Sequence, residues 1–212
     1  MKIVMFDIDG TLIESTDFDT TLYIQSVRDV LGDVFIKEGW EQYKNVTDTG
    51  ILLEIASDNG IKYDDIWLKK VQAKFYDYIA SHIKTNGCKP IKGAVQLIES
   101  LSKDANYKVG FATGGWRNTA ELKLRTAGFD ISKIPIVTSS EHFSRTTIMQ
   151  MCKNAIPGEF EEVIYFGDGI WDMKASKELS WKFVGIGSKF QSQNVPWILD
   201  YTDTKITNKE LL

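Results

Sequence analysis

The sequence has few of the residues on which disulfide frameworks and zinc sites depend, and it lacks the excess of basic residues typical of nucleic-acid surfaces. Only two of its 212 residues are cysteines and two are histidines. Cys88 and Cys152 are too far apart in the chain for a metal-binding or redox motif, so we expect buried or idle thiols in a reducing compartment. The formal net charge is −4 and no run of basic residues occurs. We therefore expect neither nucleic acid nor an anionic membrane as a partner.

Long apolar runs are also missing. No stretch approaches the roughly 18 consecutive apolar residues of a membrane-spanning helix. Residues 2–6 have the pattern of a strand, where a secreted protein would show a basic segment followed by an apolar signal core. These two absences predict a cytoplasmic protein.

The remaining composition is that of an ordinary globular protein. Hydrophobic residues make up 43% of the chain and charged residues 25%, and aromatic side chains are plentiful. A length of 212 residues allows one large domain, or a core domain that carries a smaller insertion.

The predicted elements fall into two parts. Residues 16–86 show helical patterns without a strand pattern, and the helices end near Gly32, Asp58 and Asn86. After residue 87, strands alternate with helices. Strands are predicted at residues 107–112, 134–138, 162–166 and 182–186, and helices at residues 51–58, 93–103, 117–127, 141–154 and 170–179. Residues 197–199 fit either a short strand or a segment packed on the sheet edge.

This alternation predicts an α/β fold, a three-layer Rossmann-like core with a parallel sheet and right-handed crossovers. The strand at residues 2–6 belongs to that sheet, so the helical block is an insertion after the first strand. The predicted division is a core domain of residues 1–15 and 87–212, with an all-helical cap domain of residues 16–86. Pro135 favours an edge position for its strand.

The first strand ends in two carboxylates, Asp7 and Asp9, followed by Gly10 and Thr11. Charges at the end of a buried strand are costly unless they meet a cation or take part in chemistry. Ligands of open α/β sheets bind just outside the carboxyl ends of the strands, and hard oxygen ligands suit Mg²⁺. The alternative is a plain turn, because Asp-Gly is a common turn pair.

Three further strand ends carry complementary polar groups. Thr113 is followed by two glycines that open a helix, and a hydroxyl beside a helix N-terminus suits a phosphate. Arg145 follows the next strand, and Asp168 and Asp172 follow the one after. Together these are the parts of metal-assisted phosphoryl transfer, in which a carboxylate can act as the nucleophile.

The same residues carry a family resemblance. The segment Asp7-Ile8-Asp9-Gly10-Thr11-Leu12 resembles the first motif of the haloacid dehalogenase superfamily, Phe111-Ala112-Thr113-Gly114 resembles its second motif, and Gly167-Asp168-Gly169-Ile170-Trp171-Asp172-Met173 resembles its fourth. The ordered set spans nearly the whole chain. The insertion after the first strand is similar to the helical cap of the phosphoglycolate phosphatase and β-phosphoglucomutase-like members.

The resemblance implies a role for each motif residue. Asp7 would be the nucleophile and a Mg²⁺ ligand. Asp9 would be the general acid and base, and would also hold the metal through its backbone carbonyl. Thr113 and Gly114 would hold the phosphoryl group. The two acids of the fourth motif would serve the metal, Asp168 as a ligand and Asp172 in support. An acid at position 9 favours phosphate chemistry over cleavage of a carbon–halogen bond.

The third motif departs from the family pattern. That motif normally supplies a lysine, often before a proline, whereas the best-placed cation here is Arg145. Arginine keeps the charge and grips phosphate with two donors, but the two residues are not interchangeable. The alternative is that Arg145 is a solvated first-turn residue and that Lys153 or another cation serves.

Candidate substrate contacts lie in the cap and near the pocket mouth. Thr47 and Asp48 belong to a loop that would face the sheet edge. Equally, Asp48 or Thr49 would be the N-cap of the next helix. Arg117 could bind a second anionic group, although its pattern favours a helix-surface role.

The sequence therefore predicts a Mg²⁺-dependent phosphatase that acts on a small phosphorylated metabolite through an aspartyl-phosphate, as a monomer or weak homodimer. One alternative is a phosphoglucomutase-like phosphotransferase. Another is a phosphonatase, which would need a cap lysine such as Lys37, Lys44 or Lys62 as Schiff-base former. A third is a catalytically silent phosphate-binding module.

Overall fold

The protein is built on a six-stranded parallel sheet with the strand order β3-β2-β1-β4-β5-β6. The computed structural model describes residues 1–212, the side chain of Thr207 excepted. The strands are β1 (Lys2–Phe6), β2 (Tyr107–Ala112), β3 (Ile136–Val137), β4 (Glu162–Gly167), β5 (Lys182–Ile186) and β6 (Trp197–Ile198). This architecture confirms the predicted parallel α/β fold.

Strand β1 lies at the centre of the sheet, between β2 and β4, so that Phe6 is in register with Phe111 and Phe166. Successive side chains of β1 point to opposite faces. Val4 and Phe6 belong to one apolar cluster, and Ile3 and Met5 belong to the other. Both faces are therefore covered, which explains why the strand is an almost continuous apolar run.

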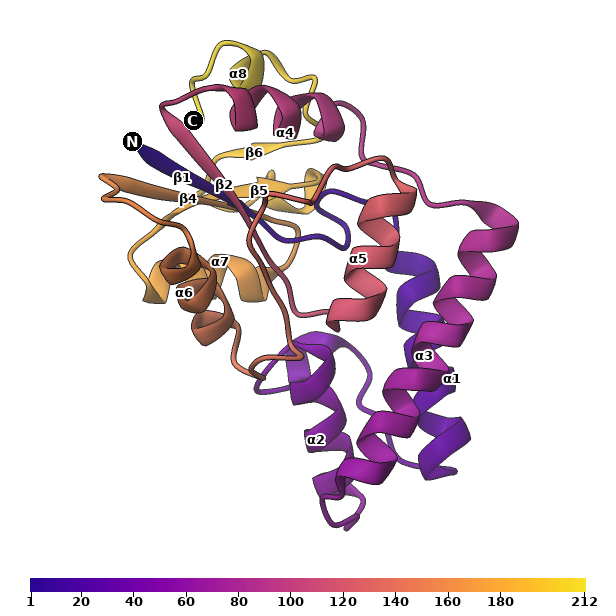
Figure 1. Cartoon of the computed structure of the whole chain (residues 1–212). Coiled ribbons are helices and arrows are strands. Elements are labelled where there is room, and N and C mark those ends of the chain that lie inside the picture. Colours follow the sequence, from indigo (N-terminus) through magenta and orange to yellow (C-terminus); the bar gives the residue numbers. More distant parts are fainter.

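The helices that cover the sheet form the two outer layers (Figure 1). Buried side chains of α4 (Ala94–Lys103) and α5 (Arg117–Thr126) pack with Phe6 on one face. Those of α6 (Arg145–Ala155) and α7 (Ile170–Glu178) pack with Met5 on the other. The remaining short elements are η2 (Ser188–Phe190) and α8 (Thr204–Thr207).

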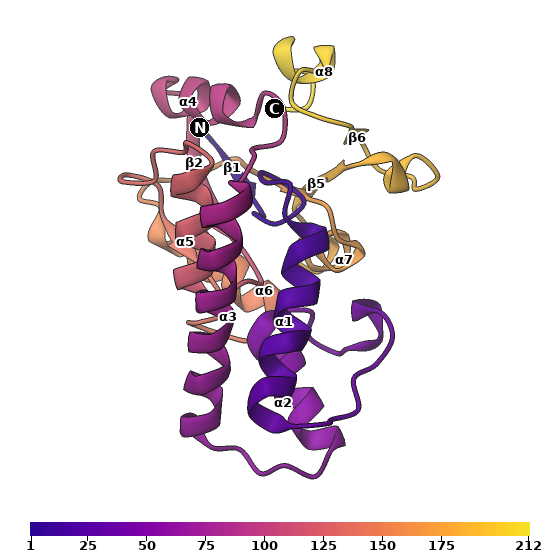
Figure 2. The same cartoon turned by 90° about the vertical axis from the view of Figure 1, so that its right-hand side faces the viewer.

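The segment between β1 and α4 is helical, as predicted. It contains α1 (Thr16–Leu31), the single turn η1 (Trp40–Gln42), α2 (Asp48–Asp58) and α3 (Asp65–Asn86). Helices α1 and α3 lie side by side beyond the sheet edge in both views (Figures 1 and 2). Tyr23 and Phe75 of this segment belong to the same buried cluster as Phe6, so the exact domain boundaries stay a prediction.

Several predicted boundaries were wrong. Helix α2 begins at Asp48 instead of Ile51, because Thr47 caps it by accepting a hydrogen bond from Gly50 N at 3.1 Å. Helix α6 begins at Arg145 instead of Glu141. Glu141 Oε2 accepts hydrogen bonds from the backbone and hydroxyl of Thr138, both at 2.8 Å, and this turn delays the helix.

The two edge strands are short. Strand β3 is limited to Ile136–Val137, two residues of the predicted five, and it lies at the edge as Pro135 suggested. The ambiguous tail forms the opposite edge, where β6 pairs in parallel with β5. Within the described residues, no helix is both long and apolar enough to cross a membrane.

Candidate active site

A cavity of about 150 Å³ opens at the carboxyl ends of the strands, between the sheet and the helical segment. The core contributes Asp7, Asp9, Thr113, Gly114, Gly115, Arg145, Asp168, Trp171 and Lys189 to its wall. The segment 16–51 contributes Thr16, Asp19, Thr20, Tyr23, Trp40, Val46, Thr47, Asp48 and Ile51. Most of the site residues predicted from the sequence therefore meet in one cavity.

The turn after β1 presents Asp7 and Asp9 to this cavity. Asp7 N continues the sheet by donating to Phe166 O at 2.9 Å, which fixes the nucleophile candidate at the strand end. The chain then turns at Gly10, whose φ is +73°. A Cβ at this glycine would lie 2.6 Å from Asp168 Cγ, so both the backbone angle and the close approach require glycine.

Three carboxylates converge beneath the cavity. One oxygen from each of Asp7, Asp168 and Asp172 lies within 4.8 Å of the other two. Asp172 Oδ1 is buried, and its contact in the described part of the chain is the ion pair with Arg145 Nη1, while Asp172 Oδ2 accepts from Gly169 N at 2.9 Å. Hard oxygen atoms in this arrangement fit a small divalent cation such as Mg²⁺. Asp9 lies outside this cluster, because its carboxylate accepts a hydrogen bond from Lys123 Nζ instead.

Burial makes the carboxylate cluster electrostatically costly. The pKa of Asp7 is raised well above its ordinary value, first by burial and then by the negative charge of Asp172. Burial also raises the pKa of Asp172 to about 6, although Arg145 opposes the shift. A bound cation would relieve this repulsion, since charge of the opposite sign favours the ionised carboxylates.

Arg145 is the cation at the centre of the cluster. Its Nη1 lies 3.2 Å from Asp7 Oδ1 and 2.9 Å from Asp172 Oδ1, and only 11% of its side chain is exposed. Its Nη2 donates to Val46 O at 2.9 Å, which links the core to the helical segment. Arg145 therefore occupies the position at which the sequence suggested a phosphate-binding cation, and it is not a solvated surface residue.

The Thr113 loop lines the cavity beside Asp9. Thr113 is 1% exposed, and its Oγ1 accepts a hydrogen bond from Gly115 N at 3.2 Å. Gly114 O accepts from Asp48 N at 2.8 Å. A Cβ on Gly114 would collide with the Arg145 guanidinium and lie 3.0 Å from Val46 O, so this close packing depends on glycine.

Asp9 is held by a buried lysine that the sequence analysis missed. Lys123 Nζ lies 2.5 Å from Asp9 Oδ1 and 2.6 Å from Asp19 Oδ1, and the lysine side chain is 1% exposed. Ser15 Oγ donates to the same Asp9 oxygen at 2.5 Å. Burial disfavours the charged lysine, but Asp19 and Asp9 outweigh it and raise the pKa of Lys123 above its ordinary value. Lys123 thus ties the acid/base candidate to helix α1.

The start of α2 docks on the core through four hydrogen bonds in addition to the one from Asp48 N to Gly114 O. Thr47 Oγ1 donates to Phe143 O at 2.7 Å, and Thr49 Oγ1 donates to Ser139 O at 2.7 Å. Asp48 Oδ2 accepts from Trp116 N at 2.9 Å, and Trp116 Nε1 donates to Thr49 Oγ1 at 2.8 Å. Thr47 and Asp48 therefore line the cavity as predicted, while Thr47, and neither Asp48 nor Thr49, is the N-cap.

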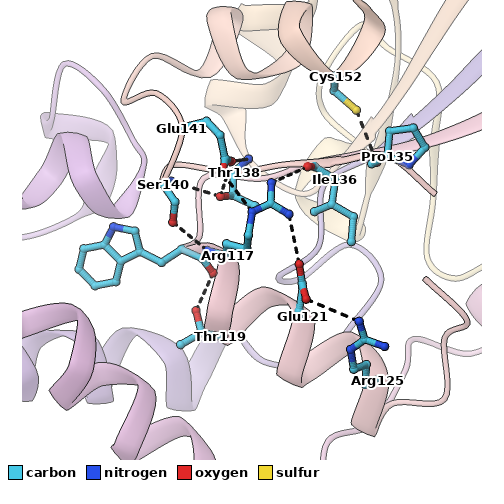
Figure 3. A network of polar contacts seen from close by, with 11 residues as sticks. Arg117, Thr119, Glu121, Arg125, Pro135, Ile136, Thr138, Ser140, Glu141 and Cys152 are labelled. Atoms are coloured by element: carbon cyan, nitrogen blue, oxygen red, sulfur yellow. Dashed lines mark hydrogen bonds and ion pairs between the residues drawn. The ribbon is translucent and has the colours of Figure 1, made fainter. Parts of the chain in front are cut away.

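Arg117 lies outside the cavity lining, and its donors are already engaged (Figure 3). Its guanidinium donates to Glu141 Oε1 at 3.0 Å, to Glu121 Oε1 at 3.1 Å and to Ile136 O at 2.7 Å. These bonds join α5 to β3 and to the turn at Glu141. The structure therefore places Arg117 in a supporting network of the core.

Sequence signals existed for some of the missed residues. Ala120 and Leu124 mark the buried face of α5, and Lys123 shares that face by helical spacing. Lys189 follows β5, a further strand end that carries a polar group, and its Nζ lies 3.0 Å from Asp168 Oδ2. The position of Asp19 in the cavity depends on how α1 packs, which the sequence pattern does not contain.

Comparisons with known proteins agree with this geometry. The family model for haloacid dehalogenase-like hydrolases matches residues 4–186. A protein named as a pyrophosphatase, PpaX of Clostridium perfringens, is 24% identical over 190 residues, which cover 88% of this chain and 84% of the relative. The crystal structure of a hydrolase from Pseudomonas syringae superposes with a TM-score of 0.77 at 23% identity, covering 100% of this chain and 99% of the other. A β-phosphoglucomutase from Clostridium difficile gives 0.73 at 15% identity, with 99% of both chains covered. At such identities the structural likeness shows the fold.

Proposed function

The chain belongs to the haloacid dehalogenase-like hydrolase family and is a phosphatase-type enzyme, and from this premise we propose that it is a Mg²⁺-dependent phosphatase of small phosphate monoesters. The observation that carries the proposal is the position of Asp7. Its buried carboxylate ends the central strand, lies 3.2 Å from Arg145 Nη1 and shares a cavity with Asp9 and Thr113.

In the proposed first step, an oxygen of Asp7 attacks phosphorus and the bond from phosphorus to the ester oxygen breaks. Asp9 donates a proton to the leaving alcohol. In the second step, Asp9 takes a proton from a water molecule that attacks the aspartyl-phosphate, and phosphate leaves as Asp7 is regenerated.

The other polar groups support these steps. Arg145 would offset the negative charge of the phosphoryl group as Asp7 approaches it, and Thr113 and Gly114 would orient that group. Asp7, Asp168 and Asp172 would hold Mg²⁺, with the Asp9 carbonyl as a further ligand. When bound, the metal supplies positive charge between the carboxylates and the phosphoryl oxygens.

The phosphonatase alternative needs a lysine from the cap in the cavity. The described residues that line the cavity include one lysine, Lys189, and it comes from the core. Lys37 forms ion pairs with Glu54 and Asp58 instead. The phosphatase reading is therefore the better supported of the two.

The test is phosphate release from small phosphate esters, with Mg²⁺ and with a chelator, for the wild type and Asp7→Asn. Asp17→Asn is a matched control, because Asp17 is an exposed acid of α1 outside the cavity lining. We expect Mg²⁺-dependent release by the wild type and the control, and none by Asp7→Asn. Release that persists in Asp7→Asn, or that ignores Mg²⁺, would contradict the proposal.

A further inference from the structure

The cavity has two walls of different character. The core wall carries the phosphoryl-transfer groups, including the cations Arg145 and Lys189. The opposite wall comes from residues 16–51, and its only charged members within the described lining are Asp19 and Asp48. A phosphate bound at Asp7 would therefore point its alcohol portion toward two acids and no base.

The cation nearest to this acidic wall, Lys123, already forms ion pairs. Lys123 Nζ is buried and lies within 2.6 Å of one oxygen of Asp19 and within 2.5 Å of one oxygen of Asp9. Lys123 is not part of the cavity lining. Lys123 therefore does not reach a ligand in the cavity. It forms its ion pairs with Asp9 and Asp19 and none with Asp48 in the described part of the chain, although its positive charge opposes the burial that raises the pKa of Asp48.

Each acid of the wall keeps a free acceptor. Asp19 Oδ1 faces Lys123, and Asp48 Oδ2 accepts from Trp116 N at 2.9 Å. The second oxygen of each carboxylate accepts no hydrogen bond in the portion of the chain that the structure describes, and both residues line the cavity. Carboxylate oxygens accept hydrogen bonds, so the wall is suited to groups that donate them.

The rings of Tyr23 and Trp40 stand beside these acids and are held in place. Tyr23 Oη donates to Asp48 O at 2.6 Å, and Trp40 Nε1 donates to Thr20 Oγ1 at 3.2 Å. Tyr23 also packs against Phe75 and Trp116, so the aromatic part of this wall is rigid. A cavity of about 150 Å³ is small, comparable to an engineered cavity of about 150 Å³ that accepts benzene. A cavity of this size favours a small alcohol portion.

We propose that the substrate is the phosphate ester of a small alcohol that carries hydrogen-bond donors, hydroxyl or ammonium, and no second negative charge. This inference rests on the proposed phosphatase function and narrows it. It separates the chain from enzymes of phosphorylated acids and of bisphosphates, whose second anionic group would face Asp19 and Asp48. Burial raises the pKa of Asp48 well above its ordinary value and that of Asp19 to about 6, so these surroundings already disfavour negative charge and would disfavour a second anionic group as well.

The test compares three esters of similar size: glycerol 2-phosphate, phosphoethanolamine and phosphoglycolate. Methyl phosphate, with neither a donor nor a second charge, reports the basal reaction. We expect kcat/KM for glycerol 2-phosphate or phosphoethanolamine to exceed that for phosphoglycolate by roughly tenfold or more. The first two compounds distinguish a hydroxyl donor from an ammonium donor. Phosphoglycolate turnover equal to or faster than both would overturn the inference.

The variant Asp48→Asn isolates the charge of the wall, because asparagine keeps the size of the side chain. In this variant, the ratio of kcat/KM for the donor esters to kcat/KM for phosphoglycolate should be smaller than in the wild type. The change should come mainly from a lower KM for phosphoglycolate. Asp17→Asn removes an exposed acid outside the lining and should leave the ratio unchanged. An unchanged ratio in Asp48→Asn would count against the wall as the source of selectivity.

Calorimetric binding to Asp7→Asn separates this inference from the proposed function. If no ester is turned over, methyl phosphate included, the phosphatase proposal fails. The calorimetric affinities of the same three esters for Asp7→Asn can then still be compared, because binding does not require catalysis. Tighter binding of the donor esters than of phosphoglycolate supports the inference, and equal or weaker binding overturns it.

Discussion

Lys123 Nζ lies 2.5 Å from Asp9 Oδ1 and is buried at the point where the sheet meets helix α1. The same nitrogen contacts Asp19 at 2.6 Å, so one cation joins the acid/base candidate to the helical segment. Breaking a buried ion pair by removing one partner is costly, because it leaves uncompensated charges in a poorly solvated place.

Lys123→Met should therefore destabilise the protein by about 3–5 kcal/mol in urea unfolding. The double variant Lys123→Met/Asp19→Asn should recover part of that loss, since one of the stranded charges is gone. Lys103→Met is the control, because the Lys103 side chain is 81% exposed and pairs only loosely with Glu99. A loss in Lys123→Met no larger than in Lys103→Met would show that the buried pair contributes little.

Arg145→Met should lower kcat/KM for phosphate esters by roughly 10²–10³-fold, the usual effect of removing one preorganised donor from a developing charge. Arg145→Lys should retain more activity than Arg145→Met, because a lysine keeps the charge near Asp7 while losing the bond to Val46 O. Steady-state kinetics on the folded variants measure kcat/KM and test this order. Near-normal kcat/KM in Arg145→Met would assign the phosphate-binding role to another cation.

Mg²⁺ should stabilise the protein more at neutral pH than in mild acid. Burial raises the pKa of Asp172 from 3.8 to about 6, so the fold holds this proton more tightly than the unfolded chain does. Without metal, the Asp172 carboxyl contributes to the free energy of unfolding at low pH, and this contribution is lost as the pH rises through about 4 to 6. Mg²⁺ needs the ionised carboxylate, so its binding should strengthen over the same interval.

Thermal melting with Mg²⁺ and with a chelator, between about pH 5 and about pH 7.5, checks this coupling. At a hundredfold excess over its Kd, a ligand adds about 2.7 kcal/mol, which corresponds to roughly 5–10 °C for a chain of this size. The gap between the two melting curves should widen as the pH rises. A gap that is constant or narrows would contradict the assignment of the metal to these carboxylates.

Arg117→Ala should leave KM for small phosphate esters unchanged, because its guanidinium donates to Glu121, Glu141 and Ile136 O away from the cavity. Loss of this partly exposed network should cost about 1–2 kcal/mol of stability. Arg125→Ala is the control, since the Arg125 side chain is 62% exposed. A large rise in KM for Arg117→Ala would instead favour the second-anion role that the sequence suggested.

The sequence predicted the sheet and its strand ends because both follow from local patterns. Apolar runs such as Lys2–Phe6 mark buried strands, and polar residues directly after them must gather at one edge of a parallel sheet. The start of α6 was predicted too early, because the turn held by Thr138 and Glu141 depends on particular side-chain bonds. Lys123 was not predicted because its partners come from the turn after β1 and from α1, and only tertiary packing brings them together.

The central claim, that Asp7 forms a covalent phosphoryl intermediate, can be tested by trapping. The enzyme is quenched during turnover of a small phosphate ester with Mg²⁺ and treated with borohydride, which reduces an aspartyl-phosphate to an alcohol. Peptide mass spectrometry then locates the modified residue. The account predicts reduction at Asp7, dependent on substrate and absent in Asp7→Asn. Reduction at another carboxylate, or turnover without any reduced aspartate, would contradict it.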